Sequence, residues 1–364
     1  MAIIIVAPEV ELHADWIEWG LKEAGFAVIR WAGLGWRPED SATIYLGDRE
    51  EIYLGNHKLS SKDTVWFKRP SLAVHPEVDP TEKKFAANEY EAFKRNLLSH
   101  IELSGARCIN KWSTVLTIEN KSLQLSLASR CGLRVPATRI GNCAPFIKAF
   151  LARPDADIIH KAFRPHAWIG ADGAIYNCET TGLSQDCEWL DDTFAYAPGV
   201  YQQRIQKNCD VRVNMIGGDF HSFVITTPGI ALDWRSHGLR DGLRIERITL
   251  PLEIESALRT FADRAELAFG CFDMVVDSAG VWWFLEVNQA GQFLWIDDLQ
   301  PDDGVYEPML RFLSATEPAS DRGFPSFRRC LAECKVTEEV IPPEEDFPFR
   351  TVEKAILAAA SSSN

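Results

Sequence analysis

Hydrophobic and polar residues near the N-terminus follow the order expected of a β-α-β unit. A short apolar run, AIIIVA, precedes the amphipathic stretch ELHADWIEWGLKEAG and a second apolar run, FAVIRW. Short apolar runs predict buried strands, whereas apolar residues three or four positions apart predict a helix, here ending at Gly25. The chain should therefore begin with an α/β domain built on a parallel sheet. No G-x-G-x-x-G follows the first strand, which argues against a dinucleotide site there.

The pattern continues through the first 114 residues. We predict a hairpin around Gly47-Asp48, a strand in DTVWFKRPS, a long amphipathic helix in TEKKFAANEYEAFKRNLLSHIELSG and a short strand in RCIN. Residues 110–117 are expected to form a crossing loop.

Helix and strand patterns also alternate in residues 115–198. The expected elements are a helix in TIENKSLQLSLASRCG, an extended RVPATRIG, a short helix from Pro145 to Arg153, and strands in DIIHKAF and AIYNCET. A glycine-containing loop from Arg164 to Gly173 separates the last two strands. An acidic, irregular stretch is expected from Thr181 to Ala197.

Hairpins dominate residues 199–315. After a strand in GVYQQRIQ, the segment DVRVNMIGGDFHSFVIT predicts a hairpin whose Gly-Gly pair favours a type I′ turn. A helix in EIESALRTFADRAELAFG precedes a second hairpin, CFDMVVDSAGVWWFLEVN, and a helix from about residue 304 to 314. Because 364 residues exceed one compact core, we predict separate domains at 1–114, 115–198 and 199–315, with a peripheral tail at 316–364.

Composition narrows the functional classes. Lys and Arg number 38 against 52 Asp and Glu, a net charge of −14, so we expect no nucleic-acid partner. Nine cysteines without a C-x-x-C pair predict reduced thiols and a cytoplasmic protein. The N-terminus lacks a basic leader, and no apolar run is long enough to span a bilayer, so no membrane partner is expected.

The second hairpin carries the first candidate chemistry. Because side chains alternate along a strand, Glu286 and Asn288 should share a face with Trp282 and Phe284, leaving Val281, Trp283, Leu285 and Val287 as the core face. A two- or four-residue turn would place Asp273 opposite Phe284, on the face of Glu286. A three-residue turn would place it on the other face.

Asp273, Glu286 and Asn288 would together offer two carboxylates and one amide oxygen. Such a set suits Mg²⁺, which one or two carboxylates and substrate phosphates usually hold. The alternative is the solvated face of an edge hairpin.

Cationic residues stand where phosphates could meet them. Lys161 lies inside the apolar strand DIIHKAF, an unfavourable place for an ammonium without an anion. Lys121 opens a helix, where a positive charge opposes the helix dipole unless a phosphate binds at the same end. The alternative for each is a surface lysine with a buried stem.

Two Asp–Arg pairs complete the candidate residues. Each pair sits two residues apart on one strand face, where arginine suits planar oxyanions and the alternative is an ordinary surface ion pair. The pairs are Asp210 with Arg212, and Asp233 with Arg235.

Five motifs together resemble the ATP-grasp ligases. FLEVNQAGQFLWID resembles the FLEVNPxGQFLWLE signature of the microviridin-type (graspetide) peptide macrocyclases. VWFKRP, ENKSLQLSLASRCGLRVPAT, YQQRIQKNCDVRV and LDWR resemble further motifs of that family in the same order. More distantly, the chain is similar to ribosomal-protein glutamate ligases and glutathione synthetases. The resemblance implies an α/β, ATP-grasp fold in which a parallel N-terminal domain precedes two α+β lobes that sandwich the nucleotide.

The resemblance also implies a role for each candidate residue. The implied metal ligands, for two Mg²⁺ ions on ATP, are Asp273, Glu286 and Asn288. The implied nucleotide contacts are Lys121 and Lys161 at the phosphates or the adenine side, Gln202, Gln203 and Ile205 at the adenine hinge, and Asp210, which would either reach the ribose or orient Arg212. The implied catalytic residues are Arg212 and Arg235, facing the phosphoryl group or the substrate carboxylate, with Asp210 and Asp233 beside them. The loop from Arg164 to Gly173 would close over the phosphates.

Three positions depart from the family pattern. Gln289 stands where proline is usual, Gln203 where glutamate is usual, and Lys68 replaces the first arginine of the RRP motif. None of them removes an implied metal ligand, so we expect catalysis to persist.

The implied reaction is ATP-dependent side-chain ligation of a ribosomally made precursor peptide. An Asp or Glu carboxylate would become an acyl phosphate and then an ester or amide with Ser, Thr or Lys. The expected partner is the precursor peptide, with a leader groove near the acidic segment 179–192, and the resemblance also implies a homodimer. The alternatives are a ligase for free amino acids or a peptide C-terminus, and a nucleotide-binding module without ligase activity.

Overall fold

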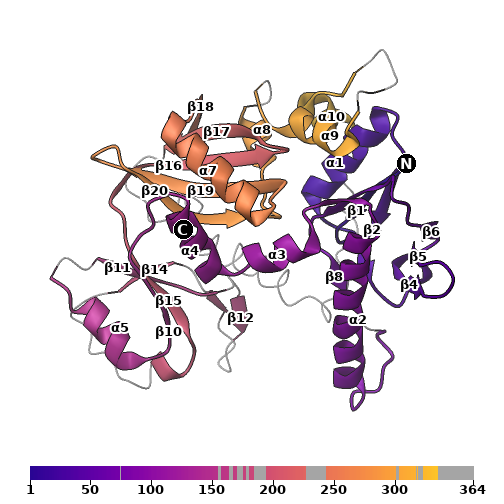
Figure 1. The fold of residues 1–364 in the computed structure, drawn as a ribbon, viewed down its shortest axis with the longest axis horizontal. Helices are drawn as coiled ribbons and strands as arrows, with labels where there is room; N and C mark the ends of the chain where they lie inside the picture. The colour runs from indigo at the N-terminus through magenta and orange to yellow at the C-terminus, as the bar shows by residue number, and fades with distance from the viewer. Residues whose placement is uncertain are drawn as a thin grey trace.

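The structure of the chain is a computed structural model. It describes residues 1–73, 75–154, 157–163, 167–169, 175–177, 180–183, 194–226, 243–300, 303–316, 318 and 323–334. The described strands form three larger sheets, which we call the N-terminal, central and C-terminal sheets (Figure 1).

The N-terminal sheet is parallel, as the β-α-β pattern predicts. Its order is β2-β1-β7-β9. Its strands are β1 (Ile3–Val6), β2 (Val28–Trp31), β7 (Thr64–Phe67) and β9 (Arg107–Ile109). Two small sheets accompany it, formed by β3 (Gly33–Leu34) with β8 (Ser71–Leu72), and by β4 (Ala42–Tyr45), β5 (Glu51–Leu54) and β6 (His57–Lys58), with the short 3₁₀ turn η1 (Pro38–Asp40) between them.

The central sheet is antiparallel, in the order β10-β15-β11-β14. Its strands are β10 (Thr138–Gly141), β11 (Ile158–Lys161), β14 (Thr181–Leu183) and β15 (Gly199–Gln203). A separate hairpin joins β12 (Ala167–Ile169) to β13 (Ile175–Asn177). The stretch expected to be irregular from residue 181 thus begins with a strand, because β14 pairs with the edge of β11.

The C-terminal sheet is antiparallel, in the order β18-β17-β16-β19-β20. Its strands are β16 (Lys207–Ile216), β17 (Asp219–Thr226), β18 (Arg244–Ile248), β19 (Phe269–Asp277) and β20 (Trp282–Asn288). The predicted two-residue turn joins β16 to β17, since Ile216 pairs with Asp219. Both turn residues, Gly217 and Gly218, have positive φ (61° and 101°), which explains the Gly-Gly pair.

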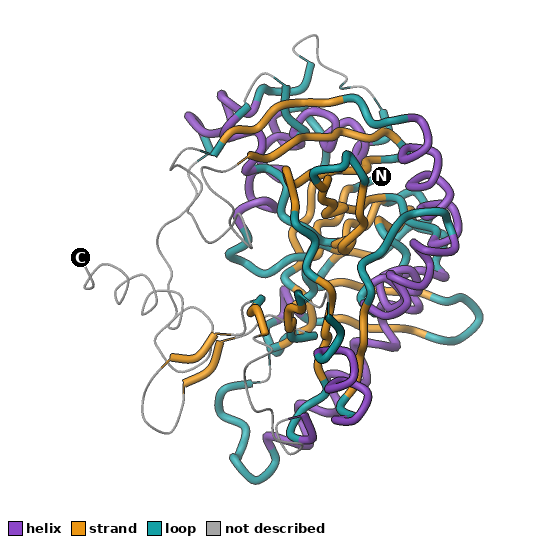
Figure 2. The backbone as a smooth tube through the Cα atoms, turned by 90° about the vertical axis from the view of Figure 1, so that its left-hand side faces the viewer, coloured by secondary structure: helices purple, strands orange, loops and turns teal. Residues whose placement is uncertain are grey.

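The described helices cover both faces of the N-terminal sheet, and many of them lie along the right-hand side of the view in Figure 2. They are α1 (Leu12–Glu23), α2 (Lys83–Leu103), α3 (Trp112–Ile118), α4 (Lys121–Arg130), α5 (Ala144–Leu151), α7 (Leu252–Ala265), α8 (Trp295–Leu299), α9 (Tyr306–Ser314) and α10 (Phe327–Glu333). The predicted crossing loop at 110–117 is wrong, because most of it forms α3. Val115 and Ile118 are buried in this helix, and Glu102 binds the Ser113 N–H near its start at 2.8 Å.

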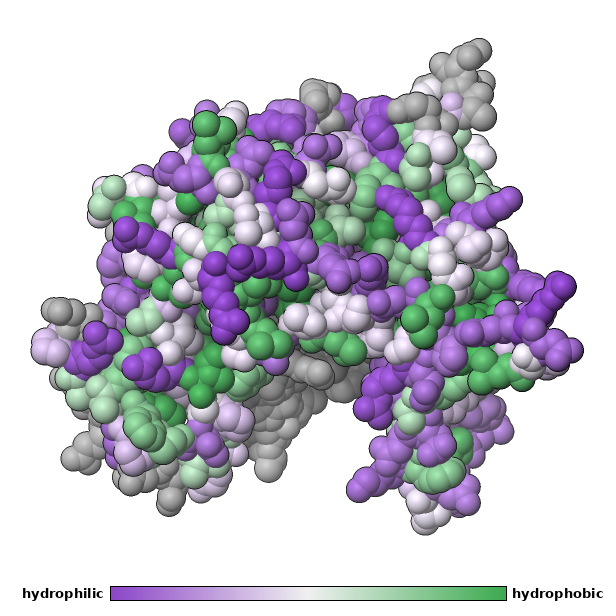
Figure 3. Space-filling model, in the orientation of Figure 1, coloured by the Kyte–Doolittle hydropathy of each residue, from purple (hydrophilic) through white to green (hydrophobic). Residues whose placement is uncertain are grey.

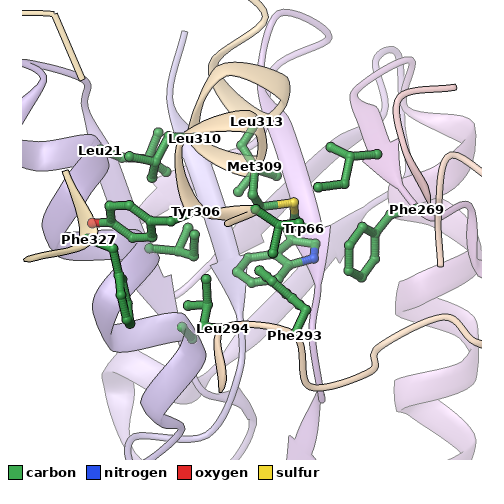
Figure 4. Packing of buried hydrophobic residues seen from close by; sticks show 14 of the residues in the cluster. Leu21, Trp66, Phe269, Phe293, Leu294, Tyr306, Met309, Leu310, Leu313 and Phe327 are labelled. Atoms are coloured by element: carbon green, nitrogen blue, oxygen red, sulfur yellow. The ribbon is translucent and has the colours of Figure 1, made fainter. Parts of the chain in front are cut away.

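Four hydrophobic clusters hold the described parts together. The largest joins one face of the N-terminal sheet to α1, α9, α10 and one end of the C-terminal sheet (Figure 4). Within it, Trp66 of the N-terminal sheet lies more than 200 residues in sequence from Phe269 and Phe293, whose rings are in edge contact with each other. Phe327 and Cys330 of α10 are also buried in it, so this part of the predicted tail packs against the core.

The other three clusters are more local. One lies between the opposite face of the N-terminal sheet and α2, and one lies between the C-terminal sheet, α4 and α7. The fourth lies between the central sheet and α5, and shares no residue with the others. On the face shown in Figure 3, hydrophilic and hydrophobic residues are interspersed over these parts. Among the described helices, none is both long and apolar enough to cross a membrane.

Candidate functional site

The hairpin of β19 and β20 places its carboxylates by means of a β-bulge. Asp277 N–H donates to Val281 O (3.0 Å), so the turn between them has three residues, the length predicted to face Asp273 away from Glu286. The pairing register then shifts by one residue at Leu285, so that Met274 pairs with Phe284 but Asp273 pairs with Glu286. The bulge therefore reverses the effect of the turn and returns both carboxylates to one face.

The same bulge corrects the predicted assignment of faces on β20. Phe284 and Val287, three residues apart, are both buried in the cluster beneath α7. The expectation that Phe284 and Trp282 share the face of Glu286, with Leu285 in the core, is wrong. An extra residue in the strand interrupts strict alternation, which the sequence pattern assumed.

Arg212, Asp273 and Glu286 form a row across three neighbouring strands. Arg212 of β16 pairs with Asp273 of β19, which pairs with Glu286 of β20. Arg212 Nη1 donates to Asp273 Oδ1 at 2.8 Å, and the arginine side chain is only 7% exposed. A charge-assisted bond to so buried a guanidinium fixes the carboxylate firmly. Asn288 follows at the end of β20, with its amide nitrogen 3.4 Å from Glu286 Oε1.

Lys121 meets this row from the first turn of α4. Its Nζ lies 3.5 Å from Glu286 Oε2, and both side chains are 24% exposed. Asn120 caps the helix, because its Oδ1 accepts from the N–H groups of Ser122 (3.1 Å) and Leu123 (3.2 Å). The helix start and its lysine thus border the carboxylate face.

Gln124 explains why α4 sits beside β20, a contact that the sequence did not reveal. Its Nε2 donates to Val287 O (2.9 Å) and to Ile118 O, and its Oε1 accepts from Val287 N–H (3.0 Å). The side chain is 5% exposed. One residue therefore completes the hydrogen bonding of the outer edge of β20 at the point between the two candidate ligands.

Lys161 lies on the central sheet, beside the predicted hinge. Its Nζ donates to Gln202 Oε1 at 3.0 Å, and Gln202 Nε2 donates to Thr138 Oγ1 at 3.1 Å. Gln202 is 2% exposed, so its polar side chain serves to hold the lysine across the sheet.

The backbone of the predicted hinge is partly committed to the protein. Gln203 N–H donates to Ala137 O (2.8 Å), and Arg204 N–H donates to Asp157 O (2.7 Å). Within the described residues the Ile205 N–H has no such partner, which leaves it available to a ligand.

Asp210 does not orient Arg212 directly. Its two carboxylate oxygens accept from Lys207 Nζ at 2.9 and 2.6 Å, and both side chains are mostly buried. Arg212 instead turns its second nitrogen, Nη2, to Gln292 O at 3.1 Å.

Comparison with known proteins bears on the fold. No protein-family model and no curated protein matches the chain. Among solved structures, a RiPP-associated ATP-grasp ligase of Chryseobacterium gregarium, in complex with ADP and a leader and core peptide, superposes with a TM-score of 0.73. It is 23% identical and is matched over 86% of this chain and 97% of its own.

Two further structures are similar at lower identity. The macrocyclase MdnC of Microcystis aeruginosa MRC, bound with precursor peptide MdnA, has a TM-score of 0.71 at 20% identity, covering 86% of this chain and 99% of MdnC. The ATP-grasp ligase PsnB, complexed with minimal precursor, Mg and ADP, has a TM-score of 0.65 at 19% identity, covering 86% and 97%.

This chain has the ATP-grasp fold. The fold class predicted from the sequence is thereby confirmed. Within this fold, the row of Arg212, Asp273 and Glu286 lies on the C-terminal sheet, and Lys161 lies on the central sheet.

The donor atoms of this ATP-grasp chain fit Mg²⁺ on a nucleotide. No group of three or more His, Cys, Asp or Glu side chains suited to a metal occurs in the described ranges. Two carboxylates and an amide on one face match a metal whose remaining ligands are phosphates and water. The neighbouring cations, Arg212 and Lys121, hold the two carboxylates in place from either side.

Part of the predicted site lies outside the described residues. This applies to Asp233 and Arg235, to most of the loop from 164 to 173, and to most of the acidic segment from 179 to 192. Their roles stay predictions.

The N-terminal sheet also reaches the site, through residues that the sequence did not mark as functional. Lys68 is 1% exposed, and its Nζ donates to the carbonyls of Ala290 (2.9 Å) and Gly291 (2.7 Å), just beyond Asn288. Burial lowers the pKa of Lys68 to about 8, while the charge of Glu11 opposes this shift. Burial and the nearby cations Lys68, Arg69 and Arg212 likewise lower the pKa of His13 to about 2.

Proposed function

We propose that the chain is an ADP-forming ATP-grasp ligase that activates an Asp or Glu side chain of a precursor peptide and joins it to a Ser, Thr or Lys side chain. The observation that carries this proposal is the row of Arg212, Asp273 and Glu286, with Lys121 3.5 Å from its outer carboxylate. The similar structures support the choice of substrate, since all three are complexes with a leader, core or precursor peptide, and two of them, the Chryseobacterium ligase and PsnB, also contain ADP.

The proposed chemistry has two steps. A carboxylate oxygen of the peptide attacks the terminal phosphorus of ATP, and ADP leaves with the bridging oxygen. The hydroxyl or amine of the second side chain then attacks the acyl carbon, phosphate leaves, and the nucleophile loses its proton. Bound magnesium would neutralise charge on the phosphate oxygens.

In this proposal, residues of the C-terminal and central sheets have different roles in binding ATP and the metal ions. Asp273, Glu286 and Asn288 would hold the metal ions, and Lys121 and Lys161 would neutralise phosphate charge. Arg212 lies at the inner end of the row, where its fixed guanidinium stabilises charge on the transferred group. The backbone of Ile205 receives the adenine, and Gln202 orients Lys161.

The proposal assigns residues 115–198 and 199–315 to the two lobes around the nucleotide and residues 1–114 to the N-terminal domain. A groove for the leader peptide near residues 179–192 and a homodimer are part of the same proposal.

Intact mass of the peptide product provides the test. The purified chain is incubated with ATP, Mg²⁺ and short peptides encoded beside its gene, and each linkage formed should remove one water from the peptide mass. The matched control is Glu286→Gln, which keeps the side-chain shape and removes a metal-binding charge.

Two other outcomes would redirect the proposal. ADP release with free amino acids, but with no peptide, would identify a ligase for small substrates. Binding of ATP by calorimetry without ADP formation on any carboxylate would identify a nucleotide-binding module.

A further inference from the structure

The loop after the candidate metal ligands is held by side chains at every carbonyl from residue 289 to 292. Asn110 Nδ2 lies 3.4 Å from Gln289 O, and Lys68 Nζ donates to Ala290 O (2.9 Å) and Gly291 O (2.7 Å). Arg212 Nη2 donates to Gln292 O (3.1 Å). We call residues 289–292 the clamped loop. Four successive carbonyls bound by side chains, and not by a helix or sheet, show that this backbone is fixed from outside.

The clamping residues come from distant parts of the chain. Lys68 follows β7 and Asn110 follows β9, both in the N-terminal sheet, whereas the clamped loop follows β20 of the C-terminal sheet. Asn110 also accepts from the N–H groups of Ala268 (2.8 Å) and Phe269 (2.9 Å) at the start of β19. The N-terminal sheet therefore grips both strands of the hairpin that carries Asp273, Glu286 and Asn288.

Close packing around the clamped loop restricts its backbone to this conformation. At Gly291 an added Cβ would lie 2.8 Å from Cys271 Cβ, so the backbone runs against β19 where only glycine fits. Lys68 is fully enclosed, with its Nζ 5.4 Å from the ring centre of Phe293 and 5.9 Å from that of Trp66. A buried ammonium needs acceptors, and those that the structure gives Lys68 are the loop carbonyls.

One of the residues that bind the clamped loop, Arg212, also belongs to the row of Arg212, Asp273 and Glu286. Arg212 binds the loop with Nη2 and Asp273 with Nη1. A shift of the loop would therefore displace Arg212 and Asp273 at one end and Asn288, its direct neighbour in sequence, at the other.

We propose that Lys68 is a positioning residue for the metal site, which acts through the clamped loop with Asn110 as its partner. This inference rests on the proposed function. Lys68 touches neither substrate nor metal in this scheme. It makes the geometry of the C-terminal metal ligands depend on the N-terminal sheet, in the manner of the outer partners that orient ligands in metal sites.

The test compares Lys68→Met with wild type by two measurements. Hydrogen exchange of the backbone reports on the loop directly, in peptides covering residues 289–296. Electron paramagnetic resonance with Mn²⁺, added with a non-hydrolysable ATP analogue, reports on the metal site without turnover. Lys68→Met should speed exchange in the loop and weaken Mn²⁺ binding by about tenfold or more.

Two further variants separate positioning from stability. Lys68→Arg keeps a positive charge and several hydrogen-bond donors, so both the hydrogen exchange of the loop and the Mn²⁺ affinity should stay close to their wild-type values. Ile101→Ala removes a buried side chain from the α2 cluster on the opposite face of the N-terminal sheet, so it should lower the melting temperature while leaving both readings unchanged. If Lys68→Met does not fold, Lys68→Gln takes its place with the same expectation, because glutamine is polar but shorter than lysine and carries no charge.

The outcomes are distinct. Wild-type Mn²⁺ affinity in Lys68→Met, with or without faster exchange, would overturn the positioning role while leaving the ligase proposal intact. A wild-type chain that binds no Mn²⁺ with the analogue would overturn the ligase proposal, and this inference with it.

Discussion

Replacing Gln124 with methionine should destabilise the C-terminal sheet far more than a single polar substitution usually does. Methionine fills nearly the same volume but can neither donate to Val287 O and Ile118 O nor accept from Val287 N–H. Each such bond contributes about 1 kcal/mol net, and each buried group left unpaired costs about 1–3 kcal/mol. Three backbone groups lose their partner, so we expect a loss of about 3 kcal/mol or more.

Urea denaturation followed by tryptophan fluorescence measures this loss, since Trp282 and Trp283 lie on the strand concerned. The midpoint should fall while the slope of the free energy against urea stays constant, because the surface exposed on unfolding is unchanged. The matched control is Gln206→Met. Gln206 is exposed, and within the described part of the chain its side chain donates only to Asp157 Oδ2 (2.6 Å), so its loss should change stability by less than about 0.5 kcal/mol. Equal effects of the two substitutions would refute the role assigned to Gln124.

Three further predictions concern charge. Glu286→Gln should reduce ADP formation by about 100-fold or more at an unchanged melting temperature, because a metal contributes several kcal/mol to transition-state stabilisation; wild-type turnover would refute the assignment. Lys161→Met should weaken binding of an ATP analogue about tenfold in calorimetry, the effect of losing about 1.4 kcal/mol; an unchanged Kd would exclude a phosphate contact. Burial raises the pKa of the Asp297 carboxyl from 3.8 to about 6, so the folded chain binds the proton of this carboxyl more tightly than the unfolded chain does. The free energy of unfolding should therefore fall by up to about 3 kcal/mol as the pH rises from 4 to 6. Asp297→Asn should make the free energy of unfolding, measured by denaturation at each pH, fall less steeply over this range. The same pH dependence in the variant and the wild type would contradict the raised pKa of Asp297.

The order of strands and helices was largely readable from hydrophobic periodicity. Buried strands such as IIIV and long amphipathic helices have strong patterns, and the Gly-Gly pair identified the first hairpin of the C-terminal sheet. The short helix α3 was missed because seven residues show too few turns for a period to emerge.

The register of the second hairpin could not be read, because two irregularities compensate each other. A three-residue turn displaces Asp273 by one position, and the bulge at Leu285 displaces it back. Alternation alone therefore left the face of Asp273 open between the possible turn lengths, and it assigned Phe284 to the wrong face.

The residues that support the site left only a faint sequence signal. Lys68, Asn110 and Gln124 are polar residues within or beside apolar runs, which is a reason to suspect buried partners. Their partners are backbone groups up to 223 positions away, as in the bond from Lys68 to Gly291. Backbone atoms are the same in every residue, so no side-chain pattern could have identified them.

The separate cluster beneath the central sheet has a mechanical consequence. The N-terminal and C-terminal sheets share one continuous core with α1, α9 and α10, so sliding between them would disrupt tightly packed aromatic side chains. The central sheet and α5 are packed around their own core, which includes Phe150, Phe194 and Tyr201. We therefore expect the central sheet to move as a lid about its connections to the rest of the chain, carrying Lys161 towards or away from the proposed metal ligands, while the other two sheets remain a rigid base.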